Sequence, residues 1–369
     1  MKFNSSTSFV LQSSTRPDDG SMFVPTTPET AIWGRLPNRN DPPILRVASG
    51  PTLTFDTVSH EGILEDQGRD PGSFFGAHGV AGDFVLDDCR MFASSTVQHD
   101  PSEDGPHVIT GPVAVEGAEP GDLLAARMVT LEPRASYGIV SNRHGKGTLP
   151  DEFPLGDQAV VSTFCPIEPN GSGFRGVIFG GERADGTSPS VRFPLDPFLG
   201  IMAVATDTSE RLSSTPPGAH GGNLDIKRLA VGSTLYLPVQ LPGAMFSVGD
   251  PHYAQGNGEV ALTALEAPLR ATIELTVVKP GSSSFGRALF GHAFAETAEA
   301  WIAIGLHTDL NEAMRMATRR ALDIVCTHSD LDRATAYAYL SAAVDFEVSQ
   351  VVDGVKGIHA VIPKLDLRQ

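Results

Sequence analysis

Side chains that bind metals and transfer protons are concentrated in one stretch of this sequence, residues 249–259. Asp250 and His252 are two residues apart, so on an extended backbone both point to the same face. That spacing suits two ligands of one Zn²⁺ or similar divalent ion. A Gly-Asn-Gly turn would fold Glu259 back toward them, as a general base for metal-assisted hydrolysis. The alternative is a polar hairpin with Asx-type turns, but histidine and glutamate have no turn role, so the pattern favours a site.

Two shorter polar stretches contain further candidates. His60 and Glu61 are adjacent, so they reach one site only if the chain turns there, which Gly62 permits. A surface loop is the alternative for this stretch. His107 precedes an expected strand at 111–115, and taken alone it fits a hydrogen-bonded structural histidine at least as well as a ligand.

A fourth stretch reads His-Gly-Gly-Asn-Leu-Asp at 220–225, ending in the carboxylate of Asp225. Gly221 and Gly222 would let the backbone turn tightly and approach a ligand closely, between the metal-ligand type His220 and the amide of Asn223. As an anion-binding loop the stretch is weak, because no helix start clearly follows. The sequence contains neither a helical H-E-x-x-H motif nor a G-x-S-x-G elbow.

These stretches lie at the ends of expected strands, where a rigid sheet commonly presents functional groups. From residue 31 to about 290 short alternating runs recur between turn residues without helical segments, for example at 52–58, 233–240, 259–265 and 271–278. The 38 glycines and 28 prolines also favour many turns and short strands. We therefore expect sandwich or barrel layers of antiparallel strands.

The pattern changes near Pro280. Asp309 followed three residues later by Glu312 resembles a capping box, and helical spacing of apolar residues follows it. A second helix is expected at about 331–343, and a short strand after it. The sequence thus predicts an α+β, predominantly β fold in three parts: an irregular arm (1–28), a β-rich core (29–280) and an α/β part packed on that core (281–369).

Composition excludes several classes of function. The 27 Lys and Arg against 44 Asp and Glu give a formal net charge of −17, which argues against nucleic-acid binding. No run approaches the roughly 20 apolar residues of a membrane span, and the first residues lack a signal-peptide pattern. Three distant cysteines support neither a disulfide framework nor a Cys zinc site. We expect a cytoplasmic protein.

Four segments, in this order, resemble the acetamidase/formamidase family of amide hydrolases. They are T-V-S-H-E-G-I-L-E-D-Q-G (57–68), T-G-P-V-A-V-E-G-A-E-P-G-D (110–122), H-G-G-N-L-D-I-K-R-L-A-V-G-S-T-L-Y-L-P-V (220–239) and P-G-A-M-F-S-V-G-D-P-H-Y-A-Q-G-N-G-E (242–259). One departure from the family pattern is Asn257, which stands where an acidic residue is usual. The S-H-E-G variant at 59–62 is not shared by all members.

The resemblance implies an oligomeric β-rich enzyme, a homodimer or larger, that hydrolyses small linear amides such as formamide or acetamide to a carboxylic acid and ammonia. It also implies a divalent metal, with Zn²⁺ expected. The positions carried over from the family motifs are His107, His220, Asp250, His252 and Glu259.

The sequence-level mechanism assigns metal binding to His60, His220, Asp250 and His252. Glu61 or Glu259 would take the proton from water. His107, Gly221, Gly222, Asn223 and Gln255 would bind the substrate or its oxyanion. Two alternatives remain open: hydrolysis of a larger amide, ureide or cyclic imide, and a non-catalytic β-sandwich subunit that binds a small ligand.

Overall fold

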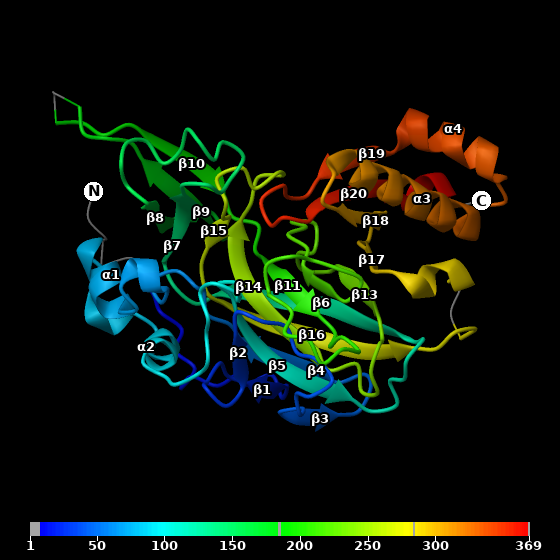
Figure 1. Ribbon diagram of the computed structural model, residues 1–369, viewed down its shortest axis with the longest axis horizontal. Coiled ribbons are helices and arrows are strands. Elements are labelled where there is room, and N and C mark those ends of the chain that lie inside the picture. The colour runs from blue at the N-terminus through cyan, green and yellow to red at the C-terminus, as the bar shows by residue number, and fades with distance from the viewer. Residues whose placement is uncertain (1–7, 184–185, 283–284, 368–369) are drawn as a thin grey trace.

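The computed structural model describes residues 8–183, 186–282 and 285–367, which form two large β-sheets with helices at their margins (Figure 1). Within these residues the first sheet has nine strands, in the order β1 (Met22–Val24), β4 (Thr52–Asp56), β16 (Leu269–Val278), β6 (Leu123–Pro133), β13 (Thr234–Pro238), β17 (Phe294–Glu296), β18 (Ala300–His307), β20 (Lys356–Pro363) and β19 (Asp345–Val348).

The second sheet runs β10 (Ser190–Pro194), β9 (Gly173–Phe179), β8 (Val160–Asn170), β7 (Tyr137–Arg143), β15 (Leu265–Glu266), β14 (Phe246–Ala254), β11 (Phe198–Ala203) and β12 (Gly221–Asn223). A branch on β14 adds β5 (Val108–Val115), which pairs with β2 (Ala31–Trp33) and β3 (Leu45–Val47). The helices are α1 (Pro71–Ala77), α2 (Asp87–Ala93), α3 (Leu310–His328) and α4 (Arg333–Ala343), with 3₁₀ turns at Glu65–Gln67, Gly82–Phe84, Arg287–Gly291 and Lys364–Leu367.

The fold is α+β and predominantly β, as the alternating runs predict. Almost all strand pairs are antiparallel; within the described residues the parallel ones are β1 with β4 and β3 with β5. Along β16, Ile273 and Leu275 are buried on the face that the sequence pattern assigns to the core. They belong to the largest apolar cluster, to which both sheets contribute. Burial of this shared interior is what holds the two sheets together.

The two C-terminal helices form where the capping signals predict them. The Asp309 carboxylate accepts a hydrogen bond from the Glu312 amide at 3.0 Å, and Asp332 caps α4 in the same way. Helix α3 packs on β18 and β20, as Figure 1 shows. It approaches β18 so closely that a Cβ on Gly305 would collide with the backbone of Ala313. The helices therefore cover one end of the first sheet.

The expectation of β structure without helices from 31 to 290 is wrong, because α1 and α2 lie in that range. Each has seven residues, too short to show helical periodicity against the surrounding turns. Local signals do exist for α1: Asp70 caps it by accepting from the Ser73 amide at 3.1 Å, and Pro71 occupies its first turn.

The strand expected at 259–265 is also wrong. Glu259 has φ +50° and Leu262 has φ +114°, and neither value is compatible with an extended strand. Only Leu265 and Glu266 pair as a strand there. The short strand after the second helix is confirmed as β19.

The three-part division of the chain stays a prediction. Residues 1–7 of the expected arm lie outside the described residues, and the remainder includes β1. At the other boundary, β17 pairs with β13, so the first sheet continues from the core into the C-terminal part. None of the described helices has the length and apolar character needed to cross a lipid bilayer.

A buried ion-pair network fixes the end of β4. The Arg134 side chain is fully buried, with Nη2 at 2.7 Å from Asp88 Oδ2 and 3.3 Å from Asp56 Oδ2. Its Nη1 donates to the Thr57 carbonyl at 2.9 Å. Arg270 binds the same Asp56 through Nε at 2.7 Å. Since β4 leads directly to the His60 stretch, this network sets where that stretch begins.

Replacing the central cation should therefore destabilise the fold strongly. Arg134→Ala would leave the buried Asp88 without a cationic partner and Asp56 with Arg270 alone, and we expect it to lower the free energy of unfolding by about 3–5 kcal/mol. Arg127→Ala is the matched control, because Arg127 pairs with Glu274 at the surface, where a loss of no more than about 1 kcal/mol is expected. Urea titration measures both, and equal losses in the two variants would contradict this role for Arg134.

Candidate active site

Two histidines from separate strand ends meet at one carboxylate. His60 follows β4 and His107 directly precedes β5, and their rings lie 5.3 Å apart, nearly perpendicular. His60 Nδ1 is 3.7 Å and His107 Nε2 is 3.6 Å from the same oxygen, Asp250 Oδ1. All three side chains are buried. Their donor atoms converge closely enough to hold a metal ion.

The neighbouring strands β14 and β15 contribute a second convergence. Register places His252 opposite Glu266, and His252 Nε2 lies 3.0 Å from both Asp250 Oδ2 and Glu266 Oε1. Neither contact of Nε2 has hydrogen-bond geometry. Nδ1 likewise has no partner, so both ring nitrogens of His252 lack a hydrogen bond among the described residues. Polar atoms buried in this way are costly unless something else satisfies them.

Several acidic residues of the site have left-handed backbone. Asp225, Asp250 and Glu259 have φ values of +49°, +51° and +50°, a conformation that costs non-glycine residues about 1–3 kcal/mol and clusters at functional sites. Gly200 on β11 makes room for two of them, since a Cβ there would collide with the Asp225 and Asp250 carboxylates. The backbone thus holds carboxylates together that would otherwise repel each other.

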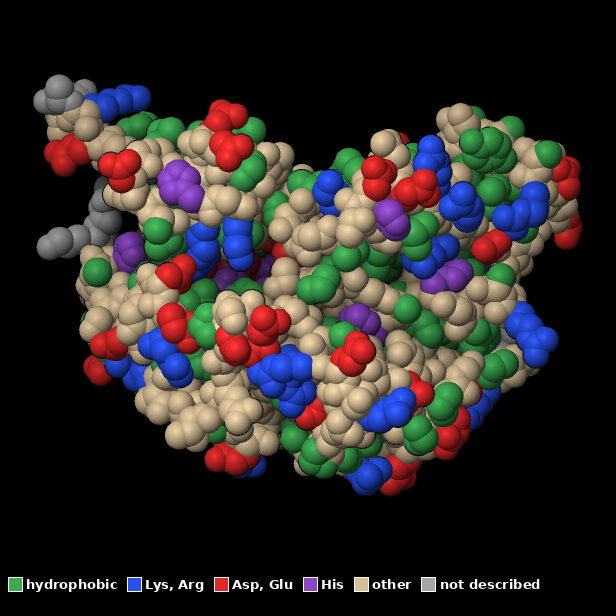
Figure 2. Space-filling model, viewed as in Figure 1, with side chains coloured by type: hydrophobic (Ala, Val, Ile, Leu, Met, Phe, Trp, Pro, Cys, Tyr) green, Lys and Arg blue, Asp and Glu red, His purple; other side chains and the backbone are tan. Residues whose placement is uncertain are grey.

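Part of this cluster lines a cavity of about 870 Å³, and we call the lined part the floor. Figure 2 shows a hollow on the viewed face with histidine side chains at its bottom beside Lys and Arg side chains. The lining side chains capable of acid–base or ligand chemistry at the floor are His60, His107, Asn223, Asp250, Glu259, Glu266 and Asp353. Substrate can therefore reach the convergent groups.

The loop between β19 and β20 supplies one of them from the C-terminal part. Asp353 is half-buried, and its Oδ2 is enclosed and has no hydrogen-bond partner among the described residues. The Gln350 side chain holds the loop, accepting from the amides of Val352 at 2.9 Å and Asp353 at 3.3 Å. It also donates to the Val355 carbonyl at 2.7 Å. Asp353 is therefore presented on a rigid turn.

Burial and mutual repulsion shift the pKa values of the acids upward. Burial raises the pKa of Asp225 and Glu259 well above the usual range, and nearby carboxylates add to the effect. It raises the pKa of Asp353 to about 7, and it also raises that of Glu266, although His252 opposes this. A carboxyl with a pKa of about 7, such as that of Asp353, exchanges protons near neutral pH.

The pKa values of His107, His252 and Asp250 reflect both burial and the charged neighbours of each group. Burial lowers the pKa of His107 to about 4. Burial also opposes charge on His252, but Asp250 and Glu266 outweigh it and raise its pKa well above the usual value. For Asp250 burial acts upward, and the adjacent histidines reverse this and lower its pKa. The site as a whole carries more buried carboxyls than cationic groups.

Most of the residues singled out from the sequence meet here. His60, His107, Asn223, Asp250 and Glu259 all line the cavity, and His252 lies among them. Their chemical roles stay predictions.

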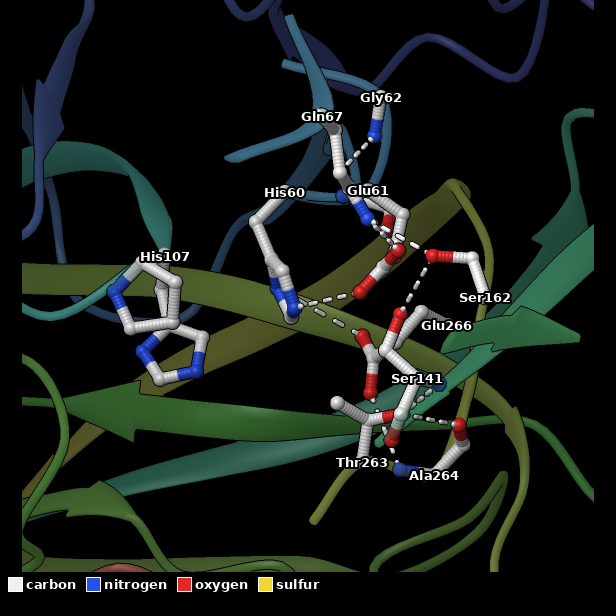
Figure 3. Close-up of polar contacts among 12 residues, drawn as sticks. His60, Glu61, Gly62, Gln67, His107, Ser141, Ser162, Thr263, Ala264 and Glu266 are labelled. Atoms are coloured by element: carbon white, nitrogen blue, oxygen red, sulfur yellow. Dashed lines mark hydrogen bonds and ion pairs between the residues drawn. The ribbon is translucent and has the colours of Figure 1, made fainter. Parts of the chain in front are cut away.

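Glu61 lies behind this floor. A turn at 60–62 brings its Oε1 to 3.4 Å from His60 Nε2. Its Oε2 accepts from Gln67, whose own amide also reaches Ser162, as Figure 3 shows. Burial acts to raise the pKa of Glu61, but His60, Arg143 and the Ser141 hydroxyl outweigh it and hold this pKa below its usual value. Glu61 is not among the residues that line the cavity, so its contacts suit it to orienting His60.

Four other candidates are not brought to the floor. His220 packs against Gly218 and Gly222 and belongs to none of the convergent donor groups found among the described residues. Gly221 and Gly222 lie in β12, paired with β11, and a Cβ on Gly221 would collide with Met202. Their small size thus serves strand packing.

Gln255 has a supporting position. It donates to the backbone carbonyls of Asp225 at 2.9 Å and Ser349 at 3.2 Å. It therefore ties two segments that carry site acids, and it does not line the cavity.

Sequence reasoning assigned no role to Asp225, Glu266 or Asp353. Glu266 has a readable signal, because it is the one charged residue in the largely apolar run 260–269, although no motif marks it. Asp225 closes the His-Gly-Gly-Asn-Leu-Asp stretch, two residues after Asn223. Asp353 has no local signal, because only tertiary pairing brings its loop to the site.

The sequence of this chain is similar to those of known proteins. The model of the acetamidase/formamidase family matches residues 95–215 and 203–364. A predicted formamidase of Schizosaccharomyces pombe is 32% identical over 220 residues, 48% of this chain and 53% of that protein. The formamidase of Methylophilus methylotrophus is 28% identical over 218 residues, covering 49% and 54% respectively. The chain thus spans about half the length of the curated relatives it matches.

Solved structures share the fold. An acetamidase from Bacillus halodurans superposes with a TM-score of 0.68 at 24% identity, covering 93% of this chain and 97% of that one. An acetamidase/formamidase-type protein from Thermoanaerobacter tengcongensis gives 0.71 at 23% identity, covering 94% and 98%. The two-sheet architecture is therefore that of known proteins along nearly its whole length.

The raised pKa values predict how stability depends on pH once metal has been removed with a chelator. Acids and a histidine whose folded pKa is raised stabilise the protein less as pH rises through those values. For Asp353 the loss falls between its ordinary pKa of 3.8 and its raised pKa of about 7, so the chelated protein should lose this contribution to its stability as pH rises from about 4 to about 7. Asp353→Asn should remove this contribution, and a divalent cation should oppose the loss. A melting temperature that depends on pH in the same way in Asp353→Asn and in the wild type would contradict the shift.

Proposed function

This chain belongs to the acetamidase/formamidase family, and we propose that it hydrolyses the C–N bond of small linear amides to a carboxylic acid and ammonia. The observation that carries the proposal is the convergence of histidines and carboxyls with unusual pKa values on the floor of an accessible cavity. Amides need such a site, because resonance makes the carbonyl a poor electrophile and the amine a poor leaving group.

We further propose that the site binds a divalent cation, with Zn²⁺ suited to its mixed imidazole and carboxylate donors. The residues fit this role: His60 Nδ1, Asp250 Oδ1 and both ring nitrogens of His252 are buried without hydrogen-bond partners among the described residues. With His107 they would hold the ion. When bound, such an ion polarises water and lowers its pKa toward neutrality.

The chain's own residues supply the proton transfers. Glu259 lines the cavity, where its carboxylate can accept a proton from the attacking water. The same carboxyl then donates that proton to the departing nitrogen, so water is consumed and ammonia leaves. Of the two glutamates that the sequence offers as the base, the cavity position favours Glu259 over Glu61.

Substrate orientation falls to side chains beside the floor. Asn223 lines the cavity, and its amide group can donate to the substrate carbonyl, where negative charge develops. His107 Nδ1 shares a hydrogen bond with Ser214 Oγ at 2.9 Å, which fixes the ring so that Nε2 faces Asp250 and the proposed ion beside the substrate. The site would thus hold the amide in one orientation relative to Glu259.

Removing the proton carrier should abolish most turnover. Glu259→Gln keeps the size of the side chain and removes its ionisation, so we expect kcat to fall by about 100- to 10,000-fold. Glu116→Gln, at an exposed position after β5, is the matched control and should retain full activity. Ammonia release from a panel of linear amides, cyclic imides and ureides measures the effect.

Two results of that assay would count against the proposal. Full turnover by Glu259→Gln with metal bound would remove Glu259 from this role. Ammonia release from imides or ureides but from no linear amide would replace the substrate class.

Metal content tests the cation site independently of turnover. We expect about one divalent ion per chain by elemental analysis of the purified protein. His252→Gln should lose it, whereas the same substitution at His220, outside the convergent groups, should retain it. Absence of a stoichiometric ion in the wild-type protein would overturn the metal proposal, and loss only in His220→Gln would relocate the site.

A further inference from the structure

The cavity is far larger than the smallest linear amides require. Its volume of about 870 Å³ would hold roughly 30 waters at their liquid volume, whereas formamide has three non-hydrogen atoms. Pockets of about 300–1,000 Å³ are typical for much larger ligands. The space beyond the reactive floor therefore needs an occupant, and the side chains lining it indicate which chemistry would fill it.

One wall of this space is held in a strained conformation. Leu262 lines the cavity and has φ +114°, a backbone region that bulky residues rarely adopt. Such strain costs about 1–3 kcal/mol and persists where the surrounding structure enforces it, commonly at ligand sites. A glycine would adopt this backbone without strain. The leucine side chain is therefore kept here against the local conformational preference.

The surrounding segments enforce that conformation. The Leu262 amide donates to the Glu259 carbonyl at 3.2 Å, and the Val260 carbonyl accepts from the Thr148 amide at 2.9 Å. On the other side, the Gly258 amide donates to the Ser349 carbonyl at 2.9 Å. Three separate stretches of chain are thus joined around the turn that carries both Glu259 and Leu262.

Val351 and Val352 extend the same wall from the loop between β19 and β20. Both are half-buried and line the cavity, and the Gln350 side chain fixes their loop. With Leu262 they offer branched aliphatic side chains beside a floor of charged groups. An amide carbonyl at the floor would have its acyl substituent directed away from those charges, where an apolar surface favours an apolar group.

We propose that Leu262, Val351 and Val352 form an acyl-binding wall and that the preferred substrates are amides with an aliphatic acyl group longer than acetyl. The proposal rests on the proposed function and narrows its substrate class. Lys146, an exposed cationic side chain, also lines the cavity. It would instead favour an amide with a carboxylate at its far end, and this competing specificity becomes an outcome of the test.

The experiment compares kcat/KM for acetamide, propionamide, butyramide and the carboxylate-bearing succinamate. In the wild-type protein each added methylene should raise kcat/KM by about threefold to tenfold. Leu262→Gly relieves the backbone strain and removes the wall, and Leu262→Ala shortens the side chain while retaining Cβ. Both should lower the ratio of butyramide to acetamide kcat/KM toward one. Lys146→Ala is the control and should leave that ratio as in the wild type.

Binding of the product carboxylates provides a readout that does not need turnover. By calorimetry, butyrate should bind the wild-type protein more tightly than acetate, and Leu262→Gly should remove most of this difference. A wild-type preference for acetamide, or an unchanged ratio in both Leu262 variants, would overturn the wall. So would a preference for succinamate that Lys146→Ala abolishes.

Failure of the proposed function would look different. Suppose that no amide is hydrolysed but butyrate still binds more tightly than acetate through Leu262. The acyl-binding wall would then be supported as a binding site, and the hydrolysis proposal would be wrong. If butyrate and acetate bind equally, the wall falls whatever the outcome of the hydrolysis assay.

Discussion

The accumulation of acidic groups in a buried place is the constraint on which the rest of this structure depends. Asp225, Asp250, Glu259 and Glu266 are buried around one floor, with the half-buried Asp353 beside them. In this place the low dielectric makes like charges repel strongly. A chain free to relax would separate them. Here the sheet register, the left-handed backbone at three of the acids and the absence of a side chain at Gly200 prevent that relaxation.

The same constraint explains why the site is built on strands from distant parts of the chain. Strands β14 and β15 pair so that His252 faces Glu266, while the Arg134 network anchors the end of β4, from which the chain continues to His60. The strand pairing and the Arg134 network are both buried and hydrogen-bonded. These attractive interactions hold in place the acidic groups that repel one another. The free energy that stabilises the sheets is in part used to hold these charges at fixed positions.

Local patterns in the sequence were sufficient to predict some residues of the site and insufficient to predict the others. Asp250 and His252 could be paired because side chains two apart on a strand share a face, and the turn at Gly62 allowed His60 and Glu61 to converge. Glu266 and Asp353 could not be placed, since their proximity to His252 and Asp225 arises from strand pairing and from a loop at the far end of the chain. His220 was misleading because the direction of its ring depends on the tight turn that pairs Gly218 with Gly221.

The loop between β19 and β20 has a consequence for how the protein is made. The cavity floor is incomplete until this late segment has paired and delivered Asp353 and the two valines, although His60 and His107 are synthesised far earlier. Contacts of such long sequence separation form slowly, and a nascent chain would expose the apolar interior between its sheets in the meantime. The complete cavity would therefore exist only in chains whose β19 and β20 have been translated and docked.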